Sequence, residues 1–334
     1  MPLVLDRNHV LDTYADAAAK GWVVPTLCSE NLTTTEAILS ATKDHGDAIG
    51  QPNLPVTVAI TNLYSHRSQS VNYTHTRNWE VGLRLFLADL GVLTMPGSPF
   101  ERLRVMVHLD HVQHDADSEL LTWDVSHFSS IMFDASSLPF ERNMEETAKY
   151  VEKYAANIVI EGACDEIVDA TGSEVSELTT PDRAYEYVSR TGVDFVVANL
   201  GTEHRASAAD LRYHGEHARA IRDRIGRKMV LHGCSSVSDD QVRNLFADGV
   251  CKVNIWTTLE RDSSPMLFED MLKNASRITG PAKAASLAES GFLGSNAELA
   301  ARADISYYTT CYRQQIVFGQ MKEIVGRYLR LWYV

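Results

Sequence analysis

Residues 229–257 read MVLHGCSSVSDDQVRNLFADGVCKVNIWT, and this stretch indicates the fold. It begins within one short run of mainly apolar and β-branched residues, Lys228–His232, and ends just after another, Cys251–Trp256. Such runs, when they do not alternate with polar residues, are typical of strands buried on both faces of a parallel sheet. Between them, Ser238–Asp248 has a helical pattern. The stretch therefore predicts a strand, a helix and a second, parallel strand.

The same unit recurs along the chain. Six more runs of this kind bring the total to eight, and helical patterns separate them. The six runs are Trp22–Cys28, Pro55–Thr61, Arg104–Leu109, Ser130–Asp134, Asn157–Glu161 and Asp194–Leu200. The other helices are predicted over Thr34–Lys43, Asn78–Leu90, Glu141–Ala155, Pro181–Arg190 and Ala208–Ile225. Eight strand–helix units in about 250 residues predict an α/β fold, the (β/α)8 TIM barrel.

We expect the 334 residues to form a single domain. The barrel is predicted over about residues 20–280 and an additional C-terminal helical extension over about 290–334. Helical stretches are expected around Ala297–Ala303 and Tyr307–Leu331. A doubly wound open sheet is the alternative fold, but no glycine-rich dinucleotide motif or phosphate-binding-loop motif favours it.

The composition is that of an ordinary globular protein, with 45% hydrophobic and 22% charged residues. The 31 basic and 44 acidic residues give a formal charge of −13, which argues against binding to nucleic acid or to an anionic membrane surface. No signal-peptide pattern and no apolar run of membrane-spanning length is present. The five cysteines are odd in number and widely spaced, which disfavours a disulfide framework. We therefore expect a cytoplasmic protein.

Polar residues gather where the predicted strands end, and active sites of TIM barrels lie at the carboxyl ends of the strands. His111, His204 and His232 end three different runs. Three imidazoles on one rim suit a catalytic zinc ion with an open fourth position. Because the chain has 12 histidines, three structural histidines are the alternative. Asp110 is expected on the opposite side of the strand from His111, where it transfers protons or caps a helix.

The loops after the last two strands are the usual phosphate site of this fold. Here they contain Gly233, Ser235, Ser236, Thr257 and Thr258. Backbone amides and hydroxyl groups bind a phosphate without needing much positive charge. Simple turn and capping roles are the alternative.

Four blocks of this sequence resemble the class II, zinc-dependent ketose-bisphosphate aldolases, the family of fructose- and tagatose-bisphosphate aldolases. The resemblance runs from about Trp22 to Trp256 and is looser in the C-terminal helices. The blocks are VHLDH at 107–111, FSSIMFDASSLPFERN at 128–143, TGVDFVVANLGTEH at 191–204, and the stretch at 229–257.

The resemblance implies the roles of four residues. His111, His204 and His232 would bind one catalytic zinc ion, and Asp110 would exchange a proton with the aldehyde oxygen or the C4 hydroxyl. Zinc polarises a ketone carbonyl as a Lewis acid, which permits an enediolate.

The resemblance also implies a site for dihydroxyacetone phosphate. Gly233, Ser235 and Thr257 would hold its phosphate, and Asn254 would hydrogen-bond its ketone portion. Asn31 is similar to the asparagine that many members carry after the first strand.

One departure from the family pattern concerns the carboxylate that removes the carbon-bound proton. The family's Glu-x-Glu-Leu-Gly reads EGACD at 161–165, so Ala163 replaces the second acid. The Gly-Gly-x-Glu-Asp loop that carries the base is absent. We favour Glu166 as the replacement. The other candidates are Asp165, Asp169, Glu174 and Glu177.

Other departures surround the substrate. Arg205 stands where the family has glycine, and Trp256 replaces the acidic residue after Asn254 and Ile255. Arg205 suits bidentate binding of a phosphate or carboxylate, with an outward salt bridge as the alternative. Trp256 either stacks on the substrate or fills the barrel mouth.

The sequence therefore predicts an aldolase, a lyase that reversibly makes or breaks a carbon–carbon bond through a zinc-stabilised enediolate. Dihydroxyacetone phosphate or a related ketone is the expected donor, and the acceptor is a non-standard aldehyde. The alternatives are another metal-dependent lyase or epimerase, or an inactive barrel that binds a sugar phosphate. A homodimer or homotetramer is expected from the resemblance, and whether a monovalent cation assists stays open.

Overall fold

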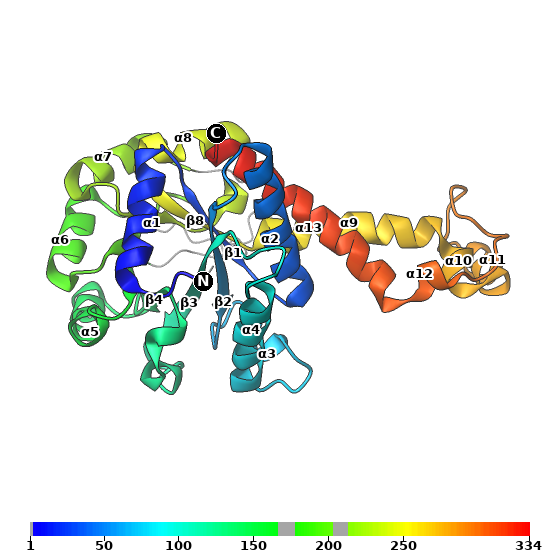
Figure 1. The fold of residues 1–334 in the computed structure, drawn as a ribbon, viewed down its shortest axis with the longest axis horizontal. Helices are drawn as coiled ribbons and strands as arrows, with labels where there is room; N and C mark the ends of the chain where they lie inside the picture. The colour runs from blue at the N-terminus through cyan, green and yellow to red at the C-terminus, as the bar shows by residue number, and fades with distance from the viewer. Residues whose placement is uncertain (1–2, 166–177, 203–212) are drawn as a thin grey trace.

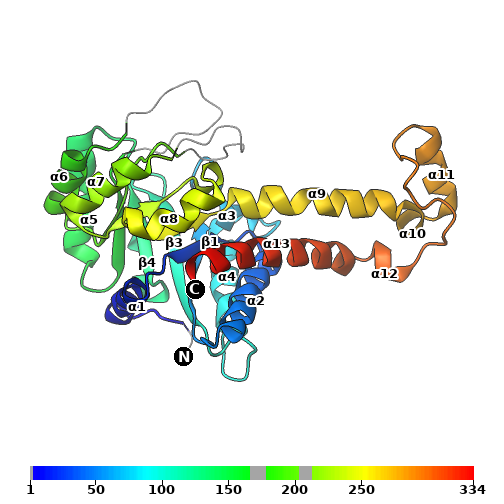
Figure 2. The same ribbon diagram turned by 90° about the horizontal axis from the view of Figure 1, so that it is seen from above.

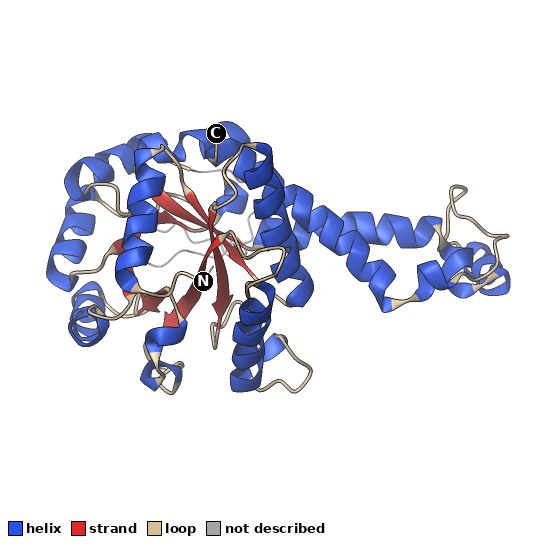
Figure 3. Cartoon of the chain, viewed as in Figure 1, coloured by secondary structure: helices blue, strands red, loops and turns tan. Residues whose placement is uncertain are grey.

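Eight parallel strands close into a barrel in the computed structural model, which describes residues 3–165, 178–202 and 213–334 (Figures 1 and 3). The strands follow one another around the barrel in sequence order, and β1 pairs with β8 to close it. They are β1 (Val24–Cys28), β2 (Pro55–Thr61), β3 (Arg104–Gln113), β4 (Ser130–Asp134), β5 (Val159–Ala163), β6 (Phe195–Val197), β7 (Met229–Leu231) and β8 (Val250–Ile255). The closed sheet confirms the predicted TIM barrel and excludes the open doubly wound sheet.

The strands are buried almost throughout, as their apolar runs predict. All residues of β1, β2 and β8 are buried, and β3 is buried except at its two end residues. Each of the eight predicted runs overlaps an observed strand. β3 continues four residues beyond its predicted end at Leu109, to Gln113, whereas β6 is shorter than the run predicted over Asp194–Leu200.

Helices cover the outside of the barrel, and most begin at a residue that caps them. Asn31 caps α2, Asn78 caps α4, and Ser238 with Gln241 forms a capping box on α8. The helices up to β8 are α1 (Arg7–Ala19), α2 (Leu32–Ala48), α3 (Gln69–Asn72), α4 (Trp79–Leu93), α5 (Phe140–Tyr154), α6 (Pro181–Thr191), α7 (Gly215–Ile225) and α8 (Asp239–Asp248). The first residues of the helix predicted over 208–225 lie outside the described residues.

Helix α1 packs at the amino-terminal end of the strands. Arg7 donates to both carboxylate oxygens of Asp194 and to the carbonyl of Ile158. Tyr14 packs against Phe195, with ring centroids 4.7 Å apart. Since α1 occupies this end, the carboxyl ends of the strands remain for a site.

The C-terminal helices form an arm that extends away from the barrel and returns to it (Figures 1 and 2). The arm runs outward along α9 (Thr257–Lys273), turns through α10 (Ala275–Thr279), α11 (Pro281–Glu289) and α12 (Ile305–Tyr308), and returns along α13 (Thr310–Trp332). At the end of α13, the indole of Trp332 donates to the carbonyl of Val242 and the hydroxyl of Tyr333 to that of Pro55. These bonds fasten the chain end to the barrel.

Of the two helices predicted in this part of the chain, one is confirmed and one is wrong. The stretch at 307–331 is confirmed, because α13 covers most of it. The helix predicted around 297–303 is wrong, since these residues form turns and bends. Glu298 explains the difference: its carboxylate accepts from the backbone amides of Ala300 and Ala301 and so satisfies them without helical bonds.

Among the helices that the structure describes, none combines the length and the apolar character needed to cross a membrane. All five cysteines are free thiols, in agreement with the expected lack of a disulfide framework.

The close approach of α3 and α4 generates a stability prediction. A Cβ on Gly82 would lie 1.9 Å from the carbonyl oxygen of Ser70, whereas Gly91 of the same helix has no atom within 4 Å of that position. We expect Gly82→Ala to lower the free energy of unfolding by about 1–3 kcal/mol, because the backbone must move. Gly91→Ala, the matched control, should raise it by up to about 1 kcal/mol through helix propensity. Urea unfolding of both variants measures this; equal effects would contradict it.

Candidate active site

A pocket opens at the carboxyl ends of β1, β2, β3, β7 and β8. Polar and aromatic side chains from five strands and their following loops converge on it, as expected of a TIM-barrel site. Its lining comprises Cys28, Thr61, Tyr64, His66, Arg67, Gln69, Asp110, His111, His232, Gly233, Cys234, Ser235, Asn254, Ile255, Trp256, Thr257 and Thr258.

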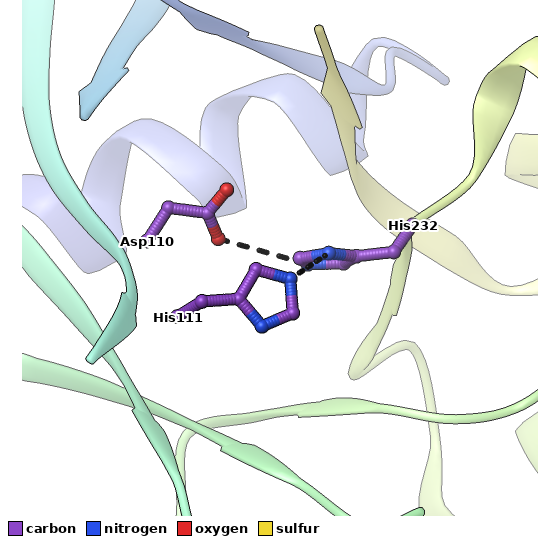
Figure 4. A group of neighbouring side chains, drawn as sticks. All are labelled: Asp110, His111 and His232. Atoms are coloured by element: carbon purple, nitrogen blue, oxygen red, sulfur yellow. Dashed lines mark hydrogen bonds and ion pairs between the residues drawn. The ribbon is translucent and has the colours of Figure 1, made fainter. Parts of the chain in front are cut away.

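Asp110, His111 and His232 form a buried cluster in this pocket (Figure 4). Their potential ligand atoms all lie within 4.8 Å of one another. Nε2 of His111 is 3.1 Å from Nδ1 of His232, and Oδ1 of Asp110 is 4.0 Å from Nε2 of His232. Two imidazole nitrogens bound to one tetrahedral zinc ion at about 2.0–2.1 Å would be roughly 3.3 Å apart. The two histidines therefore fit a zinc ion.

The expectation that Asp110 and His111 lie on opposite sides of the strand is wrong. Leu109 pairs with Ile131, but Val112 pairs with Phe133, so β3 contains one residue more than β4 in this interval. His111 also has a left-handed backbone, with φ of 47°. Such a bulge breaks the alternation of side chains and aims both residues into the pocket (Figure 4). A non-glycine residue in this conformation costs about 1–3 kcal/mol and is common at functional sites.

Two further contacts hold the His111 ring in place. Nδ1 of His111 lies 2.8 Å from Oδ2 of Asp134 at the end of β4, and the Tyr64 ring stacks on the imidazole with centroids 4.1 Å apart. A carboxylate that accepts from one imidazole nitrogen leaves the other directed at a metal and raises its basicity. Asp134 thus orients Nε2 of His111 toward His232.

Asp110 lies within hydrogen-bonding reach of several groups. Asn254 donates from Nδ2 to its Oδ1 at 2.9 Å, and the thiol of Cys28 donates to its Oδ2 at 3.5 Å. Burial raises the pKa of Asp110, but His111, His108 and His232 outweigh it and lower that pKa well below its ordinary value. Asp110 is therefore held in its ionised, carboxylate form.

Beneath Asp110, the barrel interior holds a buried charge network that the sequence analysis did not identify. Lys252 and Glu161 form an ion pair in which both side chains are fully buried. Nζ of Lys252 is 3.1 Å from Nε2 of His108, which in turn is 3.7 Å from Oδ1 of Asp110. The signal was present: the spacing of two residues places Lys252 on the same face of β8 as Asn254.

The residues predicted to hold a phosphate meet at one side of the pocket. Gly233 has φ of 68° and turns the chain after β7. The Oγ of Ser235 is buried, with no hydrogen-bond partner in the described part of the chain. Thr257 begins the 17-residue helix α9, whose first amide groups have no side-chain cap. A helix N-terminus and a buried, unused hydroxyl together suit an anion.

One predicted residue, Asn31, does not meet the cluster. Asn31 is exposed, caps α2 through a bond from the amide of Thr34, and does not line the pocket. Its neighbour Glu30 is buried instead and contacts Arg67 and Trp256, a group that the sequence analysis missed. His204, Arg205 and Glu166 lie outside the described residues.

The fold and the cluster define a TIM-barrel protein with a candidate metal centre. The family model "Fructose-bisphosphate aldolase class-II" matches residues 8–293, so the chain belongs to the class II fructose-bisphosphate aldolase family. The match confirms the resemblance seen in the sequence.

Two curated relatives are similar over part of their length. The D-tagatose-1,6-bisphosphate aldolase subunit GatY of Klebsiella oxytoca is 32% identical over 178 residues, which are 52% of this chain and 60% of that protein. The uncharacterized protein YdjI of Escherichia coli K12 is 29% identical over 157 residues, 45% of this chain and 56% of that protein. The matched segments therefore span less than two thirds of these relatives.

Solved structures share the fold over nearly the whole chain. Fructose-bisphosphate aldolase from Campylobacter jejuni has a TM-score of 0.74 and 18% identity, over 99% of this chain and 95% of that one. The YdjI aldolase from Escherichia coli K12 has a TM-score of 0.63 and 19% identity, over 96% and 94%.

The buried ion pair generates a second stability prediction. Lys252→Met leaves Glu161 buried without its cation, and we expect a loss of about 3–5 kcal/mol in the free energy of unfolding. The double variant Lys252→Met/Glu161→Gln should recover much of that loss, because no unpaired charge remains. Urea unfolding at pH 7 measures both, and a double variant no more stable than the single one would refute this account.

Glu260, in the first turn of α9, generates a pH prediction. Burial, followed by the charge of Glu30, raises its pKa from 4.5 to about 7, against an opposing effect of Arg67. The folded protein thus binds this proton more tightly than the unfolded chain. The resulting stabilisation is full below the unfolded value of 4.5 and is lost as the pH rises to about 7.

Glu260→Gln removes this dependence. Its melting temperature should exceed that of the wild type by a few degrees, about 2–6 °C, at pH 8 and match it near pH 4. Thermal unfolding across this range is the measurement. Glu269→Gln, at an exposed position of the same helix, is the matched control and should follow the wild type at every pH.

Proposed function

We propose that this protein is a zinc-dependent class II aldolase that reversibly cleaves or forms a carbon–carbon bond, with dihydroxyacetone phosphate or a related ketone as donor. The observation that carries the proposal is the buried cluster of Asp110, His111 and His232 at the bulge in β3. Membership of the aldolase family supports it. The acceptor is a non-standard aldehyde.

His111 and His232 would hold the zinc ion, together with His204 as the third ligand. Zinc, when bound, polarises the ketone carbonyl and stabilises the negative charge that develops on its oxygens. The hydrogen bond from His111 to Asp134 supports this role, because it fixes the ring that would bind the metal.

Asp110 would move the proton on the acceptor side. In the direction of bond formation it carries the proton to the aldehyde oxygen, and in cleavage it removes that proton from the hydroxyl group. The amide of Asn254 holds its carboxylate, while the Oδ1 of Asn254 is buried without a partner among the residues described. That oxygen would accept a hydrogen bond from a hydroxyl of the ketone. Glu166 is our proposed base for the carbon-bound proton.

The donor phosphate would lie between Gly233, Ser235 and the start of α9 at Thr257. The unused Ser235 hydroxyl and the uncapped amides of α9 are the features that support this placement. Arg205 is a further proposed anion contact. We also propose a cytoplasmic location and a homodimeric or homotetrameric assembly, as for other members of the family.

The test follows exchange of the hydroxymethyl protons of dihydroxyacetone phosphate by NMR in D₂O. We expect zinc-dependent exchange that chelation stops, and none in His111→Ala, because proton removal needs the polarised ketone. Ser235→Ala should weaken substrate binding about 10-fold or more, the usual effect of losing a hydrogen bond to a charged group. Ser290→Ala, in an exposed turn of the arm, is the matched control.

Exchange that persists in His111→Ala would contradict the zinc role. A zinc-loaded, folded protein that binds dihydroxyacetone phosphate but neither exchanges its protons nor forms product would favour the inactive, sugar-phosphate-binding barrel.

A further inference from the structure

The wall of the pocket next to β1 and β2 contains one strong cation. Arg67, in the loop after β2, is the only arginine or lysine among the described residues that line the pocket. A free guanidinium group here would bind a phosphate bidentately. Whether this arginine is free therefore decides what kind of ligand the wall accepts.

The guanidinium group of Arg67 is already bound by the carboxylate of Glu30. Glu30 lies two residues after the end of β1, is 6% exposed, and forms an ion pair with Arg67. Nε of Arg67 is 3.0 Å from Oε1 and 3.1 Å from Oε2 of Glu30, and Nη2 also donates to Oε2. One edge of the guanidinium fork is therefore used within the protein.

The same carboxylate is held by two further donors. The indole of Trp256 donates to Oε1 of Glu30 at 2.7 Å, and the amide of Gln69 donates to it at 3.2 Å. Donors from the loop after β2, from α3 and from the residue after β8 thus fix this carboxylate. Such a fully bonded buried carboxylate does not release its arginine without leaving donors unsatisfied.

The local charge is at most neutral. Glu30 cancels the charge of Arg67. A phosphate dianion in this part of the pocket would meet no net positive charge. The hydroxyl groups of a neutral ligand would contact the remaining guanidinium N–H groups of Arg67 and the flat face of Trp256.

We propose that Glu30 is a specificity-determining residue that keeps the acceptor end of the pocket selective for an uncharged, hydroxylated aldehyde by neutralising Arg67. The proposal rests on the proposed aldolase function. In that function the donor phosphate lies at the ends of β7 and β8, and Asp110 of β3 faces the reacting aldehyde. The rest of the acceptor then extends along the wall formed by β1 and β2, where Arg67 lies.

The first experiment compares two acceptors that differ only in a phosphate. With dihydroxyacetone phosphate as donor and zinc present, kcat/KM is measured for glyceraldehyde and for glyceraldehyde 3-phosphate. We expect the unphosphorylated aldehyde to be favoured at least 10-fold by the wild-type protein. A preference for the phosphorylated aldehyde would overturn the proposal without any variant.

Glu30→Gln keeps the shape of the side chain but removes its charge, so Arg67 becomes available. We expect kcat/KM for glyceraldehyde 3-phosphate to rise at least 10-fold, mainly through KM, while that for glyceraldehyde changes less than 3-fold. The matched control Glu30→Gln/Arg67→Met should lose this gain. A merely structural role of Glu30 would lower both values together and would refute the proposal.

A titration with inorganic phosphate, followed by calorimetry, asks the same question without turnover. In the wild-type protein, Arg67→Met should leave phosphate binding unchanged. Glu30→Gln should bind one further equivalent of phosphate, and adding Arg67→Met to this variant should remove that equivalent. Loss of all aldol and exchange activity would count against the proposed function, and this titration would still decide the role of Glu30. Phosphate binding that Arg67→Met abolishes in the otherwise wild-type protein would overturn the proposal.

Discussion

The bulge in β3 is the constraint on which the candidate site depends. A regular strand would direct Asp110 into the barrel and His111 out of it, because side chains alternate. The additional residue and the left-handed backbone of His111 bring both groups to His232. The surrounding barrel compensates for the strain, since β3 is paired along both edges and Asp134 and Tyr64 hold the ring of His111.

A second constraint is the buried ion pair in the barrel interior, beneath Asp110. The ion pair of Lys252 and Glu161 neutralises two charges that water cannot reach, and His108 links Lys252 to Asp110. A buried pair of this kind contributes little net stability relative to an apolar core, but removal of one partner is costly. The network thus holds the polar side chains beneath Asp110 in place, and His108 contacts the Asp110 carboxylate.

The two ends of the pocket differ in chemistry. Near β7 and β8, the start of α9 and the Ser235 hydroxyl present unused donors, as an anion site requires. Near β1 and β2, the donors of Arg67, Gln69 and Trp256 are directed at Glu30 and are used within the protein. One end of the pocket therefore has free hydrogen-bond donors, and at the other end the donors are used within the protein.

The eight strands and the barrel could be predicted from the sequence, because apolar runs and helical patterns are local signals, and the family could be predicted from four blocks of residues. The sequence also identified Asp110, His111 and His232, since strand ends share one rim of a barrel. Only the tertiary structure decided that Asp110 and His111 face the same way, because a bulge depends on the register of the neighbouring strand. The same holds for the pairing of Glu30 with Arg67 and of Lys252 with Glu161, residues 37 and 91 positions apart. The sequence around each of these residues does not show its partner, because the partners come from different strands or loops of the barrel.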